Sequence, residues 1–222
     1  VQDERADSVV TPLIATDQRD PWAQASALLQ RSWLGNGGAL HRNAAKSGWV
    51  GHGHHAAFRL AAFRALGGYD TSFSANEDAE YDHRLIKAGG RIFLAAHLPV
   101  RYCPRATPRD VFRQYWRNGF WRTRMLRHHR QRPALRQLLP IAATVACPLS
   151  LALGWIWFPF TIPALAYLGA LAMLAARAAG LAPRTGLRII WLGILMHFGF
   201  GLGSLAALRI RSATSTISQA AA

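Results

Sequence analysis

The sequence predicts an α/β domain, followed by a basic interfacial amphipathic helix and about three transmembrane helices. Strand-like and helical segments alternate over the first hundred residues, which is typical of α/β domains. Eleven arginines but a single acid, Asp110, lie between Arg101 and Arg136. Residues 138–176 then contain no Asp, Glu, Lys or Arg, and these 39 positions exceed the roughly 20 residues that one membrane-spanning helix needs.

The composition divides the 222 residues into three regions. The formal net charge is +15, and all of the acids lie before residue 111, whereas the last third is mostly apolar. We therefore place an α/β region at residues 1–106, a basic helix region at 107–137 and a membrane region at 138–222. Two cysteines cannot form a disulfide framework, and nothing in the sequence indicates an oxidising compartment.

The first half of the α/β region is predicted to contain a strand, a helix and an irregular segment. Residues 6–13 read as a short strand that Pro12 ends. Residues 21–33 are predicted to be helical because apolar side chains recur there at helical spacing. These side chains are Trp22, Ala25, Leu28, Leu29 and Trp33. Residues 34–38 form a predicted loop, and residues 39–50 are predicted to stay irregular and basic.

The second half is predicted to alternate helix and strand. The expected elements are a short helix at 61–66, an acidic helix at 77–88, and strands at 91–96 and 100–102. A Gly-Gly pair follows each helix and is a typical helix stop. Asn76, directly before the acidic helix, is a residue type that caps helices.

Three histidines, His52, His54 and His55, lie within four residues of a glycine-rich segment. They permit two interpretations, a metal site or a glycine-flanked loop that lines a pocket. His52 and His54 would share one face of an extended strand, but no carboxylate or cysteine lies nearby in the sequence to complete a metal site. The spacing therefore favours the pocket-lining loop.

The acidic helix carries the strongest candidate for chemistry. Glu77 and Asp78 lie in its first turn, where the helix dipole favours an ionised carboxylate and a general base would be well placed. The alternative is ordinary helix-start chemistry, for which acidic residues are equally suitable. The residue pattern alone leaves both interpretations open.

The region around this helix resembles the C-terminal half of a family-2 glycosyltransferase domain, closest to the succinoglycan-biosynthesis-type glucosyltransferases. The resemblance rests on Phe58-Arg59, Phe63, Leu66-Gly67-Gly68-Tyr69-Asp70, Asn76-Glu77-Asp78, Arg84-Leu85 and Gly89-Gly90-Arg91-Ile92. It implies a GT-A-like (Rossmann-like) fold in which residues 1–106 are the acceptor-side half. It also implies that Asp78 is the base that deprotonates the acceptor hydroxyl and that Glu77 orients groups nearby. Repulsion between the two carboxylates would raise one of their pKa values.

Two further segments resemble substrate-binding motifs of that family. The run from Gly53 to Arg59 matches the succinoglycan-type enzymes, which implies that His54 and His55 line the sugar-binding cleft. Gln114 and Arg117 match the Gln-x-x-Arg-Trp motif of processive synthases, which contacts the acceptor and the leaving diphosphate. Asn118 replaces the motif's Trp, and this departure argues against processive synthesis. The alternative role for Arg117 is contact with lipid headgroups alone.

The same resemblance implies a divalent cation, Mg²⁺ or Mn²⁺, held by an Asp-x-Asp motif. No Asp-x-Asp occurs in the sequence, and the resemblance covers residues 6 to about 140. We therefore expect the metal ligands and the donor-binding half to be absent from this chain.

The basic region and the apolar region after it predict membrane attachment. A helix from residue 108 would carry an apolar stripe with arginines largely off it, which is typical of a segment lying in the membrane interface. The stripe is Phe112, Tyr115, Trp116 and Phe120. Transmembrane helices are predicted at about 138–157, 162–179 and 189–208, with Gly199, Gly201 and Gly203 allowing close helix contact.

The distribution of arginines predicts the orientation. The 101–136 block and the loop with Arg177, Arg184 and Arg188 would both be cytoplasmic, so the protein is expected in the inner membrane with its catalytic part facing the cytoplasm. Arg209 and Arg211 then fall on the outer side, which the positive-inside rule disfavours. Buried soluble helices are the alternative, and three apolar segments in succession argue against it.

The leading functional hypothesis is a partial chain of an inverting glycosyltransferase. It would transfer a hexose, glucose from UDP-glucose, to a lipid-linked saccharide in exopolysaccharide biosynthesis. Its partners would be a nucleotide-sugar donor, that acceptor and the membrane. The alternative is a non-enzymatic basic membrane protein that binds anionic lipid or a partner protein. Nucleic acid is not expected, because the adjacent membrane segments make the bilayer the anionic partner.

Overall fold

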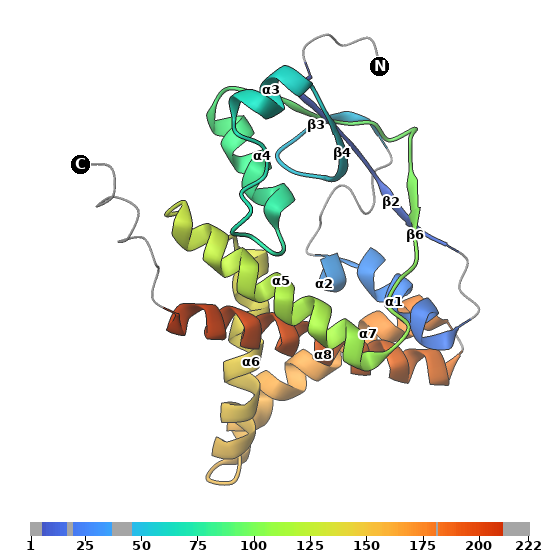
Figure 1. Cartoon of the computed structure of the whole chain (residues 1–222). Helices are drawn as coiled ribbons and strands as arrows, with labels where there is room; N and C mark the ends of the chain where they lie inside the picture. Colours follow the sequence, from blue (N-terminus) through green and yellow to red (C-terminus); the bar gives the residue numbers. More distant parts are fainter. Residues whose placement is uncertain (1–5, 17–19, 37–45, 181, 211–222) are drawn as a thin grey trace.

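The computed structural model describes residues 6–16, 20–36, 46–180 and 182–210. An α/β part sits on a group of long helices (Figure 1). The strands are β1 (Ser8–Thr11), β2 (Leu13–Ala15), β3 (Gly48–Val50), β4 (His54–Phe58), β5 (Ile92–Leu94) and β6 (Val100–Tyr102). The helices of the α/β part are α1 (Pro21–Arg31), α2 (Trp33–Asn36), α3 (Leu60–Ala65) and α4 (Glu77–Lys87). The long helices are α5 (Pro108–His128), α6 (Leu135–Leu153), α7 (Ile162–Ala179) and α8 (Pro183–Arg209), with the short turn η2 (Phe158–Thr161) before α7.

The strands form two small sheets. The first has the order β3-β5-β1-β4, in which β1 is parallel to β5 and the two outer strands are antiparallel to their neighbours. The second pairs β2 with β6 in parallel. Parallel pairs need a crossover connection, and the long segments between β1 and β5 and between β2 and β6 provide it. The α/β prediction is therefore confirmed.

A compact core fixes α4 against the first sheet. Tyr81 and Leu85, one turn apart on α4, pack with Val10 of β1 and with Ile92 and Leu94 of β5. All five side chains are at most 2% exposed. Full burial of one large apolar side chain stabilises the fold by about 1.5–3 kcal/mol. This core therefore sets the position of the acidic first turn of α4.

A second core joins α1 to the long helices. Asp20 caps α1 by accepting hydrogen bonds from the backbone N–H groups of Trp22 and Ala23, at 2.9 and 2.8 Å. Ala25 and Leu29 on its buried face pack with residues of α5, α7 and α8. These residues are Val111, Ala175, Ile189, Leu192 and Met196. Four of the five apolar residues predicted for a helix at 21–33 thus face the long helices. The helix ends at Arg31, and Trp33 is exposed on α2.

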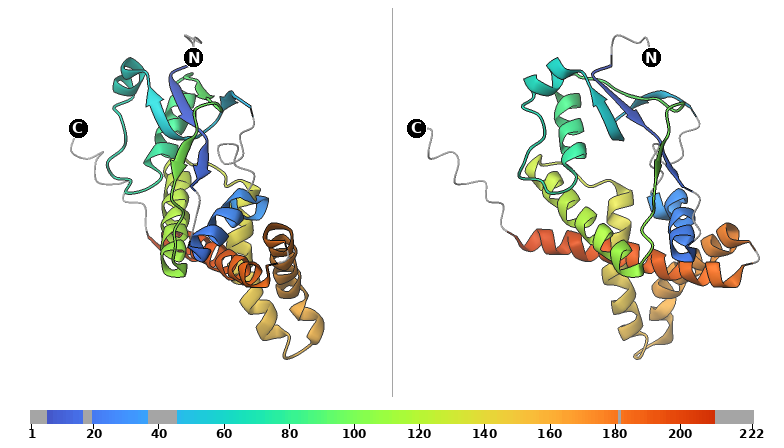
Figure 2. Two further views of the ribbon diagram at one scale, coloured as in Figure 1. Left: turned by 90° about the vertical axis from the view of Figure 1, so that its right-hand side faces the viewer. Right: turned by 45° about the vertical axis from the view of Figure 1, so that its right-hand side comes forward.

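Helices α5 and α8 run side by side (Figures 1 and 2). A Cβ atom on Gly119 would clash with the backbone of Phe200, and one on Gly203 with the backbone of Trp116. Close contact through small residues is therefore confirmed. Val111, Gly119 and Met125 are the buried residues of α5, and Tyr115 of the predicted apolar stripe packs against the α1–α8 core.

Three helices are long and apolar enough to cross a membrane by length and composition. They cover Leu135–Leu153, Phe158–Ala178 and Pro183–Arg209, close to the three predicted segments. The basic region is not one continuous helix, because α5 ends at His128 and Arg130 has a positive φ of 51°. The first apolar helix accordingly begins and ends a few residues earlier than predicted.

Some local predictions need correction. Asn76 occupies the N-cap position of α4 with φ 61°, but its side chain makes no capping hydrogen bond. Asp78 takes over this function, since its Oδ1 accepts the backbone N–H of Ala79 at 2.7 Å. The predicted loop at 34–38 begins within α2, and β3 occupies the end of the segment predicted to be irregular. Residues 37–45 and Arg211 lie outside the described residues.

Candidate functional site

A cavity of about 850 Å³ lies where the α/β part meets the long helices. One end is polar and is lined by His52, His54, Glu77 and Asp78. Three arginines also line the cavity, and they are Arg117 and Arg122 of α5 and Arg136 of α6. The other end is lined by residues of α6, α7 and α8, including Pro140, Ala143, Tyr167, Met196 and Phe200. A volume of this size is typical of small-molecule sites, and here the polar end is continuous with an apolar one.

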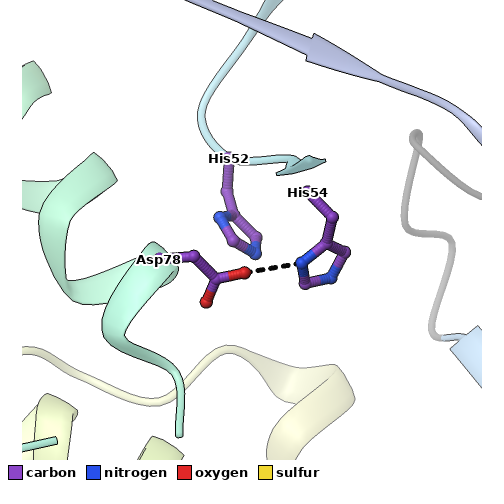
Figure 3. A group of neighbouring side chains, drawn as sticks. All are labelled: His52, His54 and Asp78. Atoms are coloured by element: carbon purple, nitrogen blue, oxygen red, sulfur yellow. Dashed lines mark hydrogen bonds and ion pairs between the residues drawn. The ribbon is translucent and has the colours of Figure 1, made fainter. Parts of the chain in front are cut away.

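Asp78 and His54 face each other across the polar end (Figure 3). His54 Nδ1 donates a hydrogen bond of 2.6 Å to Asp78 Oδ2, and the two side chains are 33% and 27% exposed. Burial raises the pKa of Asp78. The hydrogen bond from His54 and the positive charges of His54 and His52 outweigh burial and lower this pKa to about 2. Asp78 is therefore ionised at neutral pH, and repulsion between the two carboxylates does not raise the pKa of Asp78.

His52 is held by a second carboxylate one turn further along α4. Its Nδ1 donates to Asp82 Oδ2 at 2.7 Å, and the same oxygen accepts the backbone N–H of Gly53 at 3.2 Å. Asp82 is only 2% exposed, so its carboxylate serves to hold the segment before β4 and does not face the cavity. The rings of His52 and His54 meet edge to face, with centroids 5.0 Å apart.

The backbone before β4 requires a glycine to reach this position. A Cβ atom on Gly53 would overlap the side chain of Val10 in the sheet core. The chain therefore passes directly over β1, and this close approach delivers His52 and His54 to the first turns of α4.

His52, His54 and Asp78 form a group whose candidate ligand atoms lie within 4.8 Å of one another. The carboxylate comes from α4, 24 residues after His54, which is why the local spacing argued against a metal site. Two imidazoles and a carboxylate suit Mn²⁺, Fe²⁺ or Zn²⁺ better than Mg²⁺, which prefers oxygen ligands. Asp82 orients His52 as carboxylates commonly orient metal-binding histidines. The donor set therefore fits a divalent transition metal.

Of the other predicted site residues, some line the cavity and others lie outside it. Glu77 lines the cavity, and within the described residues no hydrogen bond or ion pair engages its carboxylate. His55 is exposed with φ 51° and does not line the cavity. Arg117 does line it and donates to the carbonyl of Ser74 at 2.5 Å. Gln114 lies outside it, and its buried Oε1 has no hydrogen-bond partner among the described residues.

Positive charge collects beside the acidic pair in a way that the sequence analysis missed. Arg122 and Arg136 line the cavity together with Arg117. Burial lowers the pKa of the Arg122 guanidinium, and the carboxylate of Asp78 opposes this shift. Guanidinium groups keep their charge in proteins and match phosphate oxygens well. The cavity is thus suited to an anion such as a diphosphate beside an ionised carboxylate.

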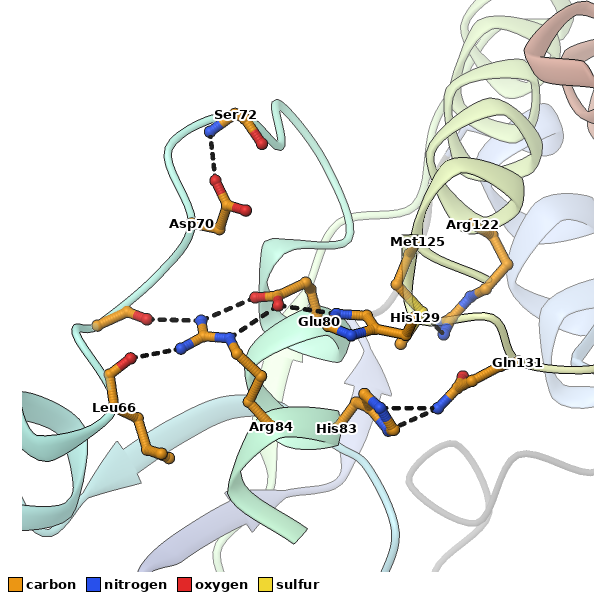
Figure 4. A network of polar contacts seen from close by, with 11 residues as sticks. Leu66, Asp70, Ser72, Glu80, His83, Arg84, Arg122, Met125, His129 and Gln131 are labelled. Atoms are coloured by element: carbon orange, nitrogen blue, oxygen red, sulfur yellow. Dashed lines mark hydrogen bonds and ion pairs between the residues drawn. The ribbon is translucent and has the colours of Figure 1, made fainter. Parts of the chain in front are cut away.

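A buried ion network holds α4 to the end of α5 (Figure 4). Glu80, 1% exposed, accepts from Arg84 at 2.7 and 2.8 Å and from His129 at 3.0 Å. Arg84 also donates to the carbonyls of Leu66 and Gly68 at 2.5 and 2.7 Å. The spacing of Glu80 and Arg84 is a recognisable helix pair, but the contact to His129 has no local sequence signal.

Comparison with known proteins identifies relatives of this chain. The family described as Glycosyl transferase family group 2 matches residues 1–181. The chain is 48% identical over 137 residues to the succinoglycan biosynthesis protein ExoA of Rhizobium meliloti (strain 1021), covering 62% of this chain and 41% of that protein. It is 38% identical over 64 residues to the O-antigen chain rhamnosyltransferase WbaN of Salmonella anatum, covering 29% of this chain and 20% of that protein.

The chain thus spans less than half the length of either relative. No solved structure gives a significant match. The match to the family covers the α/β part, α5, α6 and α7, and therefore includes the whole polar end of the cavity.

Proposed function

Because the chain belongs to glycosyl transferase family group 2, we propose that its cavity is the acceptor site of an inverting hexosyltransferase that acts on a lipid-linked saccharide. The donor would be UDP-glucose and the product a growing exopolysaccharide unit. The relative named for succinoglycan biosynthesis supports this class of product. A non-enzymatic basic membrane protein would account for neither the family match nor the His54–Asp78 pair.

One observation carries the proposal, the continuity of the cavity from ionised carboxylate to apolar helices. A lipid-linked saccharide has a sugar hydroxyl, a phosphate-containing linkage and a hydrocarbon chain in that order. The lining of the cavity brings together Asp78, three arginines and the walls of α6, α7 and α8, one group for each part of such an acceptor. A soluble saccharide would leave the apolar end without a ligand, and desolvation of that end would contribute no affinity.

In the reaction, Asp78 accepts the proton of the acceptor hydroxyl while the oxygen of that hydroxyl bonds to the anomeric carbon of the donor sugar. The bond from that carbon to the diphosphate breaks at the same time, with inversion. His54 holds the carboxylate through its hydrogen bond, and nearby guanidinium groups stabilise the charge of the departing diphosphate. A pKa of about 2 keeps Asp78 ionised, and so able to accept a proton, throughout the neutral range, while making its carboxylate a weaker base.

His52 and His54 would hold a divalent cation such as Mn²⁺ beside Asp78, and the ion when bound would supply positive charge for the diphosphate of a nucleotide-sugar donor. Asp82 and the Gly53 backbone would keep His52 in place for it. The protein would work at the inner membrane with this cavity on the cytoplasmic side, where nucleotide sugars are made.

The experiment compares two acceptors for the protein, supplied with the donor-binding half that the family resemblance implies, in lipid nanodiscs with radiolabelled UDP-glucose. One acceptor is a saccharide linked through diphosphate to an isoprenoid alcohol, and the other is the same saccharide released from its lipid. We expect transfer to the lipid-linked acceptor to be faster by at least about tenfold, because lipid binding positions the hydroxyl. Equal rates would overturn the lipid-linked assignment.

A matched pair of variants on α6 sharpens this test. Ala143→Phe fills the apolar end of the cavity, whereas Ala152→Phe adds the same ring at an exposed position outside it. The first variant should raise the KM for the lipid-linked acceptor and leave the KM for UDP-glucose unchanged. The second should change neither.

A further inference from the structure

Both ends of α8 contact the extramembrane part of the protein. Near its start, the guanidinium of Arg188 lies 5.6 Å from the ring centroid of Trp22 on α1. At its end, Arg127 of α5 donates to the carbonyls of Ala207 and Ile210 at 2.6 and 2.9 Å. A helix of 27 residues is about 40 Å long, which exceeds the roughly 30 Å hydrocarbon core of a bilayer. If α8 crossed the membrane, these two contacts would lie on opposite sides of it.

The neighbouring helix α5 packs against the second half of α8, inclined to it but running in the same general direction. Moving along both helices, Phe112 of α5 meets Gly199, Trp116 meets Gly203, and Arg127 meets Ala207. If α8 crossed the bilayer, this contact would therefore draw α5 into the hydrocarbon as well.

The composition of α5 rules out a path through hydrocarbon. This helix contains six arginines and a single acid, Asp110. An arginine at the centre of a spanning helix costs about 2.5–3.5 kcal/mol by insertion scales. Arg113, Arg117, Arg122 and Arg124 all fall in the middle of α5, so their combined cost is on the order of 10 kcal/mol. The α5–α8 pair must instead lie along the membrane surface.

The exposed surface of α8 fits this placement. Leu187, Trp191 and Leu202 are 68%, 49% and 44% exposed, and their spacing places them within one narrow helical face. Half of the most apolar window of α8 is buried inside the protein, against 17% for each of the other two apolar helices. A helix that lies in the membrane interface needs an exposed apolar stripe on one face, while its other faces pack against the protein or remain polar.

The α6–α7 hairpin has the opposite character. It projects away from the α5–α8 pair in every view (Figures 1 and 2). Its tip exposes Trp155, Ile156 and Phe158 by 94%, 78% and 70%. A cluster of exposed aromatic and aliphatic side chains with no charge nearby is suited to a bilayer.

We propose that α8 does not cross the membrane. It lies with α5 along the surface of an anionic bilayer, its Leu187–Trp191–Leu202 face in the acyl boundary, and only the α6–α7 hairpin enters the hydrocarbon. The end of α8 then lies on the same side as the α/β part. This placement puts Arg184, Arg188 and Arg209 on one side and removes the exception to the positive-inside rule that a spanning α8 creates.

The test measures depth along α8 with spin labels on single cysteines. In a background with Cys103→Ser and Cys147→Ala, labels are placed by Leu187→Cys, Trp191→Cys, Leu202→Cys and Leu208→Cys in the protein reconstituted in vesicles of anionic phospholipid. Oxygen and a water-soluble nickel complex report depth. We expect all four labels at one shallow depth. If α8 spans the bilayer, labels at Trp191 or Leu202 will lie near the bilayer centre and labels at the two ends will lie shallow. That result would overturn the proposal.

The side of the membrane on which the end of α8 lies gives a second, independent test. This test does not depend on any of the four spin-label sites. Arg209→Cys and the exposed Ala57→Cys of the α/β part are treated with a membrane-impermeant maleimide in sealed inverted vesicles and in intact cells stripped of outer membrane. Both should react from the same side. Reaction of Arg209→Cys only from the side opposite to Ala57→Cys would show that α8 spans the bilayer.

Discussion

The Nδ1 atom of His54 lies 2.6 Å from Oδ2 of Asp78. This contact gives Asp78 a second function beside its capping of α4 through Oδ1. The two interpretations of the acidic first turn are therefore compatible, because one oxygen serves the helix start and the other faces the cavity.

The pKa of Asp78 predicts a defined pH dependence of stability. Because its pKa in the folded protein, about 2, is below the ordinary value of an aspartate, Asp78 stabilises the fold above that ordinary value. The contribution is lost as pH falls from about 4 to 2. It should amount to about 1–2 kcal/mol, allowing for the partial exposure of the pair.

The measurement is thermal unfolding in detergent of the native protein and of His54→Ala between pH 7 and pH 2. His54→Ala should unfold at a lower temperature at pH 7, and the difference should shrink below pH 4. A difference that stays constant down to pH 2 would mean that the hydrogen bond does not set this pKa.

The Glu80 network predicts a large structural cost. Glu80→Ala leaves the half-buried guanidinium of Arg84 without its carboxylate and should destabilise the protein by about 2–3 kcal/mol, less than for a fully buried ion pair. Glu77→Ala, on the same helix without such a partner, should cost less than about 1 kcal/mol. Thermal unfolding of the two variants checks this. Equal losses would contradict a structural function for Glu80.

The α5–α8 contact predicts a contrast between two glycines in long helices. Gly203→Ala places a methyl group against the backbone of Trp116 and should lower the unfolding temperature by several degrees, because neither backbone can move aside. Gly169→Ala on α7, with open space around its Cβ, should be neutral or stabilise the helix by up to about 1 kcal/mol. If both changes had the same effect, the helices would not be in close contact.

The histidine group predicts binding of Mn²⁺ by the protein alone. Titration followed by electron paramagnetic resonance should show one tight site in the native protein. His52→Ala should remove it, and Asp82→Asn should weaken it by about 10–100-fold through loss of orientation of His52. Asp20→Asn, which changes a capping aspartate on α1, is the control and should bind as the native protein does. Unchanged affinity in His52→Ala would exclude this metal site.

The sequence predicts local features well where one short segment determines them. The α/β pattern, the course of α7 and the small residues of α8 all follow from periodicity or composition within a single element. The acidic helix is also predicted correctly, because its acidic first turn and its Gly89-Gly90 stop lie within one short segment.

The site was harder to predict because it is built from distant segments. His52 and His54 find their carboxylates on α4, and Glu80 finds His129 at the end of α5. No local pattern reports such contacts, since they depend on how the sheet core aligns α4. For the same reason Asp82, which by position alone would be an uninvolved neighbour of Asp78, is buried against His52 and cannot serve as a neutral control.

The central claim, that Asp78 accepts the proton of the acceptor hydroxyl, is tested most directly by single-turnover transfer from radiolabelled UDP-glucose to the lipid-linked acceptor. Asp78→Asn keeps the size of the side chain but removes the proton acceptor, so the transfer rate should fall by about 10²–10⁴-fold. Binding of UDP-glucose and the unfolding temperature at pH 2 should change little. Glu77→Gln, adjacent on the cavity wall, should keep a rate within about threefold of the native protein. A native transfer rate in Asp78→Asn, or an equal loss in Glu77→Gln, would contradict the assignment of Asp78 as the base.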